Sequence, residues 1–278
     1  MLVNIKKKSI PLILLNARIT KKSYSKWKMM PSTSNILFKS FDICFSQNKE
    51  TTKYLKSLGA KKIKFIGNLK FSESKTQKNN NFDNNLKKIF KSKKIWCAAS
   101  THDAEEKICV LTHKKLKNKY SNLLTIIIPR HIQRTNDIIN EIKNLDLKVQ
   151  THSNNSKINK STEIYLVDTY GETQSFFKIC KTVFLGGSLI NHGGQNPLEP
   201  ARFGCKILHG PYIQNFTEIY KLLNQNNLSS KFNNVNQLVK LVDQSFKQNQ
   251  NYTNKAIKLK KIGSNILDHT LTNIKYYL

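Results

Sequence analysis

The clearest chemical pattern in this sequence is a pair of glycine clusters that follow a short apolar segment. Gly186-Gly187-Ser188 comes directly after the apolar residues 182–185, and the block from Gly193 to Pro200 follows. Glycines let backbone N–H groups approach an anion closely, and a helix beginning near Pro197 would add the positive end of its dipole. Glu199 would lie in its first turn, where a carboxylate can accept hydrogen bonds from two ribose hydroxyls. The alternative is that the glycines form tight turns and Glu199 only stabilises the helix start.

Three further polar clusters also follow apolar segments. They are Ser100-Thr101-His102, Pro129-Arg130-His131 and the run from Asp168 to Glu172. Ser100 or Thr101 would cap the next helix, whereas His102 can donate to a phosphate or a carboxylate. Arg130 is one of four arginines in a chain with 47 lysines and arginines together, which suggests a need for the guanidinium fork. The alternatives are a surface arginine at 130 and a plain capped helix start at Glu172.

The elements that would position these clusters are short apolar strands alternating with amphipathic helices. Strands are expected at 10–15, 43–46, 63–66, 95–99, 123–129, 148–151, 164–167, 182–185 and 206–209. Helices are expected at 48–58, 104–120, 133–145 and 216–224. This alternation predicts an α/β fold with a parallel sheet, in which ligands bind at the carboxyl ends of the strands. The four clusters are then expected to converge.

A change in composition divides the chain. Residues 72–94 are rich in Ser, Lys and Asn, with a possible short helix near 86–90, and they predict an interdomain linker. A long surface loop is the alternative. The leading piece, 1–71, has three expected strands, which is few for an independent α/β domain. The trailing domain is expected over 95–278.

Composition excludes several classes of protein. The longest apolar run is far shorter than the ~20 residues that span a bilayer, and no signal peptide is evident. The five scattered cysteines predict reduced core residues of a cytoplasmic protein. The histidines show no ligand spacing, so we expect no metal site. The net charge of +30 has three explanations, in order of preference: codon bias, an anionic membrane surface, and nucleic acid.

Several motifs, in their order along the chain, resemble those of one enzyme family, the 3-deoxy-D-manno-octulosonic acid (Kdo) transferases. They are Asn16-Ala17-Arg18, Gly67 to Phe71, Ala99 to His102, Pro129 to His131, Gly171-Glu172, Gly186 to Ser188 and Gly193 to Pro200. The resemblance implies a GT-B fold: a complete C-terminal Rossmann-like donor domain, plus the second half of an N-terminal Rossmann-like domain. The last helix is expected to be able to cross back to the N-terminal domain.

The family resemblance also implies an activity and its residues. It implies transfer of Kdo from CMP-Kdo to a lipid A precursor in lipopolysaccharide synthesis, without a metal, on the cytoplasmic side of the inner membrane. Lys70 would stabilise negative charge on the departing CMP or the donor carboxylate. Donor-binding residues would be Ser100, His102, Pro129, Arg130, Tyr170, Gly171, Glu172, Gly187, Ser188, Asn196, Pro197, Leu198 and Glu199. Tyr170 and Gln195 depart from the family's usual residues.

The resemblance leaves one part of the family pattern unmatched. The acceptor domain of the family should extend a hundred or more residues before Met1 and include a glutamate general base. We therefore expect a fragment, a misplaced start or a separate N-terminal half, and no transfer by this chain alone. The alternatives are another GT-B enzyme, such as a UDP-sugar transferase or 2-epimerase, and a basic nucleic-acid-binding protein. The Gly193–Pro200 block argues against the first.

Overall fold

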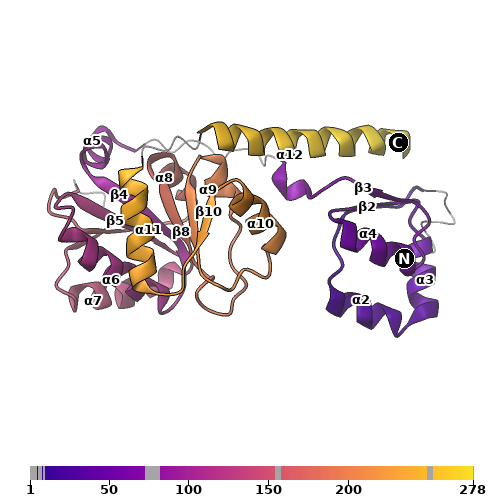
Figure 1. Cartoon of the computed structure of the whole chain (residues 1–278), viewed down its shortest axis with the longest axis horizontal. Helices are drawn as coiled ribbons and strands as arrows, with labels where there is room; N and C mark the ends of the chain where they lie inside the picture. The colour runs from indigo at the N-terminus through magenta and orange to yellow at the C-terminus, as the bar shows by residue number, and fades with distance from the viewer. Residues whose placement is uncertain are drawn as a thin grey trace. The chain divides into compact units, whose positions relative to one another are not determined.

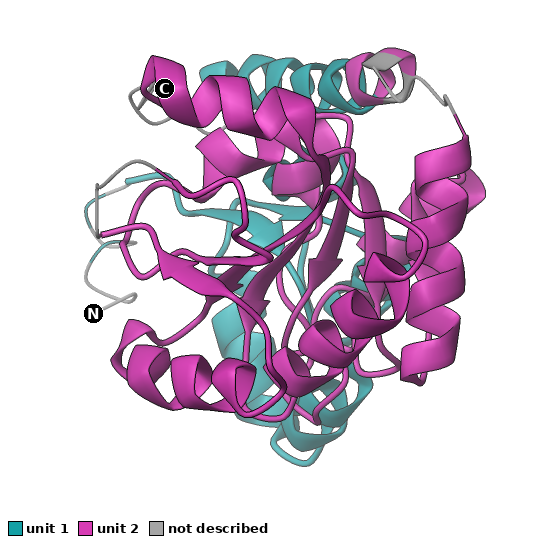
Figure 2. Ribbon diagram, turned by 90° about the vertical axis from the view of Figure 1, so that its left-hand side faces the viewer, with its two compact units in different colours: residues 1–74, 259–278 teal, residues 75–258 magenta. Residues whose placement is uncertain are grey.

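The computed structural model describes residues 5, 8, 10–72, 82–153, 158–248 and 253–277. The chain forms two compact units (Figure 2). Unit 1 comprises residues 1–74 and 259–278, and unit 2 comprises residues 75–258. The two ends of the chain therefore belong to the same unit.

Unit 1 is built on a small parallel sheet. Its strands lie in the order β1 (Ile13–Ala17), β2 (Ile43–Ser46) and β3 (Ile63–Phe65). Its helices are α2 (Lys21–Lys28), α3 (Pro31–Lys39), α4 (Lys49–Ser57) and the short η1 (Leu69–Phe71). Helix α12 (Thr253–Ile274) starts in unit 2 and continues into unit 1, where η3 (Lys275–Tyr277) follows. Backbone packing is tight here, since a Cβ at Gly263 would lie 1.9 Å from the Phe71 carbonyl oxygen.

Unit 2 contains a parallel sheet of seven strands among its described residues. Their order is β10 (Ser229–Lys231), β9 (Lys206–His209), β8 (Thr182–Leu185), β4 (Lys94–Thr101), β5 (Leu123–Pro129), β7 (Ile164–Leu166) and β6 (Val149–Thr151). The order reverses beside β4, the first strand, which pairs with both β5 and β8. Such a reversal is the point where ligands bind in open α/β sheets.

Helices cover the sheet of unit 2 on both faces (Figure 1). They are α5 (Asn84–Ser92), α6 (Glu105–Lys117), η2 (Ile132–Arg134), α7 (Thr135–Lys143), α8 (Thr173–Ile179), α9 (Leu198–Arg202), α10 (Thr217–Gln225) and α11 (Val235–Lys247). Helix α6 packs against α7 and α11, whereas α8 packs against α9. Right-handed crossovers place these two groups on opposite faces.

Burial on both faces explains why the central strands are continuous apolar runs. Every residue of β5, Leu-Leu-Thr-Ile-Ile-Ile-Pro, is buried. Trp96, Phe184 and Phe232 belong to the main core of unit 2. All five cysteines are buried and unpaired, so they act as small apolar core residues.

The predicted elements agree with most of these boundaries, and the fold class is confirmed as α/β with parallel sheets. Strands β5, β8 and β9 have the predicted bounds. Strand β10 was not predicted because Ser229-Ser230-Lys231 is polar, and it lies at the edge of the sheet. Helices α2 and α3 were also not predicted.

The predicted linker 72–94 requires a correction. Its residues 73–81 lie outside the described residues, but 84–92 form helix α5, whose N-terminus is capped by the Asp83 side chain. Phe90 is buried, and the ring of Phe82 lies 4.9 Å from that of Phe176 in α8. The segment after residue 82 therefore belongs to unit 2, because two aromatic side chains anchor an otherwise polar stretch to its core.

Candidate functional site

Four neighbouring strands of unit 2 carry the predicted polar clusters at their carboxyl ends. In the sheet these strands lie in the order β8, β4, β5 and β7. The glycine block follows β8, His102 follows β4, Arg130 follows β5, and Asp168 to Glu172 follow β7. Parallel pairing brings these ends to one edge of the sheet, as the sequence predicted.

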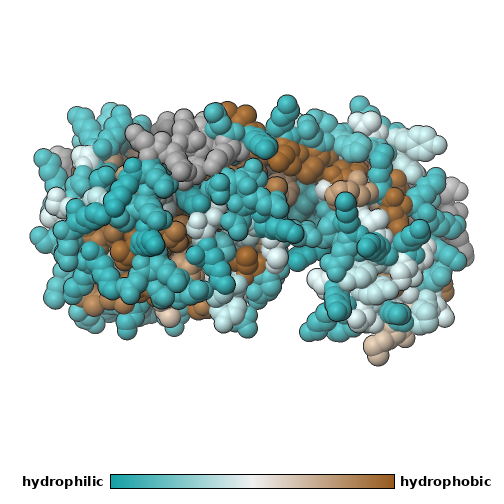
Figure 3. Space-filling model, viewed as in Figure 1, coloured by the Kyte–Doolittle hydropathy of each residue, from teal (hydrophilic) through white to brown (hydrophobic). Residues whose placement is uncertain are grey.

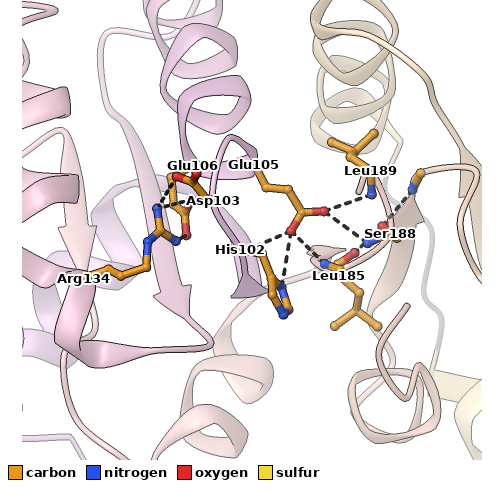
Figure 4. A network of polar contacts seen from close by, with 10 residues as sticks. His102, Asp103, Glu105, Glu106, Arg134, Leu185, Ser188 and Leu189 are labelled. Carbon is orange, nitrogen blue, oxygen red and sulfur yellow. Dashed lines mark hydrogen bonds and ion pairs between the residues drawn. The ribbon is translucent and has the colours of Figure 1, made fainter. Parts of the chain in front are cut away.

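A buried carboxylate, Glu105, is the centre of this edge (Figure 4). Its Oε2 accepts from the backbone N–H groups of His102 (2.9 Å) and Gly187 (2.7 Å). Its Oε1 accepts from those of Ser188 (3.1 Å) and Leu189 (2.9 Å). A carboxylate can be fully buried when several N–H donors replace its hydration. Glu105 therefore ties the loop after β4 to the loop after β8.

This network shows what the backbone of Gly187 and Ser188 binds, while their contact with the donor stays a prediction. Their N–H groups do bind an anion, but that anion is the chain's own Glu105 rather than a ligand. The Ser188 hydroxyl is also engaged, since it donates to the Leu185 carbonyl and accepts from Gly210 N–H. The spacing of the glycines identified an anion-binding loop, but only the fold shows which anion occupies it.

His102 is buried against this loop. The residue is 7% exposed, and neither ring nitrogen has a hydrogen-bond partner among the residues that the structure describes. Its Nδ1 lies 3.7 Å from Glu105 Oε2. The ring of His192 lies 4.5 Å away and that of His131 5.9 Å away, both between centroids. Burial, followed by the charges of His192 and His131, lowers the pKa of His102, while the nearby Ser100 carbonyl opposes this.

The two arginines that follow β5 have different roles. The Arg130 side chain is exposed and makes no hydrogen bond or ion pair with the described part of the chain, although its backbone N–H binds the Thr101 carbonyl. Arg134 instead pairs with Glu106 (3.0 Å) and Asp103 (2.8 Å). Burial raises the pKa of Glu106, and the Arg134 guanidinium acts against this. Arg130 therefore remains available to a ligand, whereas Arg134 neutralises a buried carboxylate.

The cluster after β7 is held by a histidine that the sequence analysis did not select. His152 Nε2 lies 2.9 Å from Glu172 Oε2, and its Nδ1 lies 2.7 Å from the Tyr165 hydroxyl. Glu172 also accepts from the Thr169 hydroxyl. Tyr170 is 66% exposed, and no atom lies within 4 Å of a Cβ built on Gly171. The backbone of 170–171 is thus open, while the Glu172 carboxylate is held in place.

The glycine block leads into the short helix α9, and Glu199 lies in its first turn as the sequence predicted. Pro197 is the N-cap of α9, one position before the helix begins. The Asn196 side chain accepts from Leu198 N–H (3.2 Å), and Leu198 itself is buried. Glu199 Oε1 accepts from Gln174 in α8 (2.9 Å). This contact orients the half-buried Glu199 carboxylate through one of its two oxygens. The second oxygen is the one that a ligand would contact.

The predicted residues of unit 2 follow neighbouring strands of one sheet, but two predicted residues, Ser100 and Lys70, have a different setting. Ser100 adopts φ 55° at a bulge in β4, so its role is in the backbone turn that precedes His102. Lys70 belongs to unit 1, where it lies exposed in η1 beside Asn68, whose side chain accepts from Lys70 N–H (3.0 Å). Asn16 holds the same turn by accepting from Leu69 N–H.

Other site features are limited in the described part of the chain. There, no group of three or more His, Cys, Asp or Glu side chains is arranged to hold a metal. No described helix is both long and apolar enough to cross a membrane. Unit 1 contains a surface pocket of about 490 Å³ near the amino ends of its strands, lined in part by Lys39, Lys61 and Lys62. None of the predicted site residues lines it.

Comparison with known proteins agrees with this arrangement. Residues 1–73 match the model of the family described as 3-deoxy-D-manno-octulosonic-acid transferase (kdotransferase). The 3-deoxy-D-manno-octulosonic acid transferase of Haemophilus influenzae is 31% identical over 219 residues, which cover 78% of this chain and 51% of that protein. The chain thus spans about half the length of this relative.

Solved structures give the same fold. The C-terminal CMP-Kdo binding domain of WaaA from Acinetobacter baumannii is 25% identical, with a TM-score of 0.57 over 66% of this chain and 93% of that domain. A protein from Listeria monocytogenes described as a UDP-N-acetylglucosamine 2-epimerase covers 99% of this chain and 71% of its own, with a TM-score of 0.59. Its 13% identity shows the shared fold alone. The GT-B fold is therefore confirmed, and so is the predicted resemblance: the chain is similar to Kdo transferases over about half the length of a curated member.

Proposed function

We propose that this chain holds the donor-binding part of a Kdo transferase, which transfers Kdo from CMP-Kdo to a lipid A precursor. The observation that carries the proposal is the convergence of Arg130, Glu172 and Glu199 at one edge of the unit 2 sheet. That sheet corresponds to a solved domain which binds CMP-Kdo in WaaA. The activity and the substrates are proposed rather than stated, because the match covers 51% of the Haemophilus influenzae relative.

Each group at the edge has a role suited to its chemistry. The Arg130 guanidinium, without an ion pair in the described residues, would bind the phosphate of CMP through paired N–H bonds. Glu199, already oriented by Gln174, would accept from the ribose hydroxyls. Tyr170 and Gly171 would contact the cytidine through their open backbone, beside the fixed carboxylate of Glu172.

Transfer breaks the bond between the Kdo anomeric carbon and a phosphate oxygen, and negative charge develops on the departing CMP. Lys70 would stabilise that charge as a point charge, a form of electrostatic stabilisation. No metal is assigned a role in this proposal. The acceptor hydroxyl must lose a proton as it attacks, and we assign no residue of this chain to that step.

We also propose that the protein works at an anionic membrane surface. Its acceptor would be a lipid, and the chain has a net charge of +30. Met29, Met30 and Ile36 of unit 1 are exposed apolar side chains between lysines 28 and 39. Lysines near anionic lipid contribute roughly 1 kcal/mol each, and apolar side chains add to this attraction. Peripheral attachment to the cytoplasmic side of the inner membrane follows from this proposal.

The decisive experiment is the binding of CMP to the Arg130→Ala variant. Loss of one charge-assisted contact should weaken binding by roughly 1.5–3 kcal/mol, measured by titration calorimetry on the full chain. Lys107→Ala is the matched control, because Lys107 is an exposed cation on α6 of the same unit. Unchanged affinity in Arg130→Ala, or an equal loss in the control, would contradict the proposed phosphate contact.

A further inference from the structure

The first glycine loop at the sheet edge, Gly187 to Leu189, already binds an anion that belongs to the chain itself. The backbone N–H groups of Gly187, Ser188 and Leu189 all donate to Glu105, and that of Gly194 donates to the Gly187 carbonyl (2.8 Å). A phosphate placed at the first three would have to displace a buried carboxylate. The anion of a ligand must therefore find its donors elsewhere on this edge.

His102, His131, His192 and Arg130 supply such donors. We call these four side chains the histidine cluster. They come from three different loops, which follow β4, β5 and β8. His131, His192 and Arg130 are exposed, so the cluster opens to solvent, while His102 forms its buried floor.

The buried imidazole of His102 is the feature that points to a ligand. A buried polar nitrogen without a hydrogen bond costs free energy, and such groups in native proteins call for an explanation. In the part of the chain that the structure describes, both of its ring nitrogens are in this state, and its side chain is 9% exposed. Glu105, whose Oε2 lies 3.7 Å from His102 Nδ1, already accepts four N–H bonds.

The charges facing His102 determine its protonation. From its own loop it faces Glu105, from the loop after β5 it faces His131 and Arg130, and from the loop after β8 it faces His192. Burial, followed by the effects of His192, His131 and Arg130, lowers the pKa of His102 below its ordinary value, so the ring is neutral near neutral pH. An anion between these groups would reverse the balance, because an opposite charge at close range favours the protonated ring.

We propose that the histidine cluster binds the phosphate of the nucleotide and that His102 takes up a proton when the phosphate binds. This inference rests on the proposed function and adds the chemistry of its anion site. The neutral imidazole accepts a proton from solvent, and the resulting imidazolium donates to a phosphate oxygen. Binding is thereby coupled to pH through a residue that also connects to the Glu105 network.

The first test compares CMP affinity in wild type and His102→Gln at about pH 6 and about pH 8, the range in which histidine titrates. If CMP binding takes up one proton, the affinity of the wild type for CMP should fall as the pH rises. Relative to the variant, the fall is up to roughly tenfold for each pH unit. The phosphate of CMP also titrates in this range, but the same CMP is used with both proteins. The difference between the pH profiles of wild type and His102→Gln therefore reports on His102. His269→Gln, an exposed histidine of α12, is the matched control and should retain the wild-type profile.

A second measurement uses the wild-type protein, so its outcome does not depend on whether a variant folds. It also includes a ligand without cytidine. The ring signals of His102 are followed by NMR during pH titration, without ligand, with CMP, and with inorganic sulfate as a dianion of fixed charge. We expect the midpoint of His102 to rise with either ligand. A midpoint unchanged by both ligands, or identical pH profiles for wild type and His102→Gln, would overturn the inference. If the inference about His102 is overturned in this way but CMP still binds and its binding requires Arg130, the proposed function stands. If CMP does not bind at all, the proposed function fails, and the sulfate titration alone decides the inference.

Discussion

At the scale of single residues, two carboxylates that are adjacent in sequence illustrate two ways of burying a charge. Glu105 accepts four backbone N–H bonds. Glu106 faces the other way and pairs with Arg134. Neighbouring residues in the first turn of a helix point in different directions, so one carboxylate organises the glycine loop and the other secures the loop after β5. Both loops bear residues assigned to the ligand.

A prediction at this scale concerns the ribose contact of Glu199. Glu199→Gln keeps the size of the side chain and an oxygen that can accept from Gln174, but it removes the charge. We expect CMP to bind more weakly by roughly 1–3 kcal/mol, and 2′-deoxy-CMP to lose much less, since it lacks one of the hydroxyls. Calorimetry with both nucleotides measures the difference. Glu141→Gln on α7 is the control, and an equal loss for both nucleotides would show that Glu199 does not bind the ribose.

At the scale of elements, helix α6 connects the site to the core. Its first turn contributes Glu105 and Glu106, and its next turns bury Cys109, Val110 and His113. His113 Nδ1 lies 2.9 Å from the Thr125 hydroxyl of β5, so one polar contact fixes α6 on the central sheet. His113 is fully buried, because it lies on the face of α6 that covers β5.

The burial of His113 predicts a pH dependence of stability. Burial, as the larger effect, lowers the pKa of His113 to about 4. The unfolded chain therefore binds a proton at higher pH than the native one, so this residue's contribution is complete above about pH 6.5 and is lost as the pH falls towards 4. The loss is at most about 3 kcal/mol. Thermal unfolding followed by circular dichroism should show this fall in wild type.

The His113→Asn variant tests the assignment. Asparagine can retain the contact with Thr125 but does not titrate, so the variant should unfold at a lower temperature at neutral pH and depend less on pH below about 6.5. His269→Asn, at an exposed position, should behave like wild type. Parallel pH profiles for wild type and His113→Asn would assign the acid sensitivity to other groups.

At the scale of the whole molecule, the dominant property is positive charge. The net charge of +30 is distributed over both units, and hydrophilic side chains cover most of the face seen in Figure 3. Many of these lysines have no catalytic assignment. Their combined field attracts polyanions in general, and the proposed lipid acceptor makes an anionic bilayer the most relevant one.

The corresponding prediction is salt-sensitive binding to vesicles. The chain should sediment with vesicles containing anionic lipid at low ionic strength and be released as added salt shortens the screening length. Vesicles of neutral lipid serve as the control for charge. Replacing Met29 and Ile36 together by serine should weaken binding without altering its dependence on salt, if these side chains enter the bilayer. Failure to bind anionic vesicles at low salt would leave codon bias as the explanation of the charge.

The sequence by itself determined the alternation of strands and helices, the four polar clusters at strand ends, and the family resemblance. Apolar runs indicate strands and glycines indicate turns, because both features depend mainly on residues that are close together in the sequence. It did not identify His152 as the partner of Glu172, nor His192 as a neighbour of His102. These contacts join residues far apart in the chain.

Only the tertiary structure decided which polar groups remain available to a ligand. Gly187 and Ser188 look like anion donors in sequence, yet their N–H groups are taken by Glu105, which lies more than eighty positions earlier. Arg130 and Arg134 look alike, yet one pairs with a buried carboxylate and the other does not. A hydrogen-bond donor is available only if no other part of the folded chain uses it, and that depends on every loop that the sheet brings to the same edge.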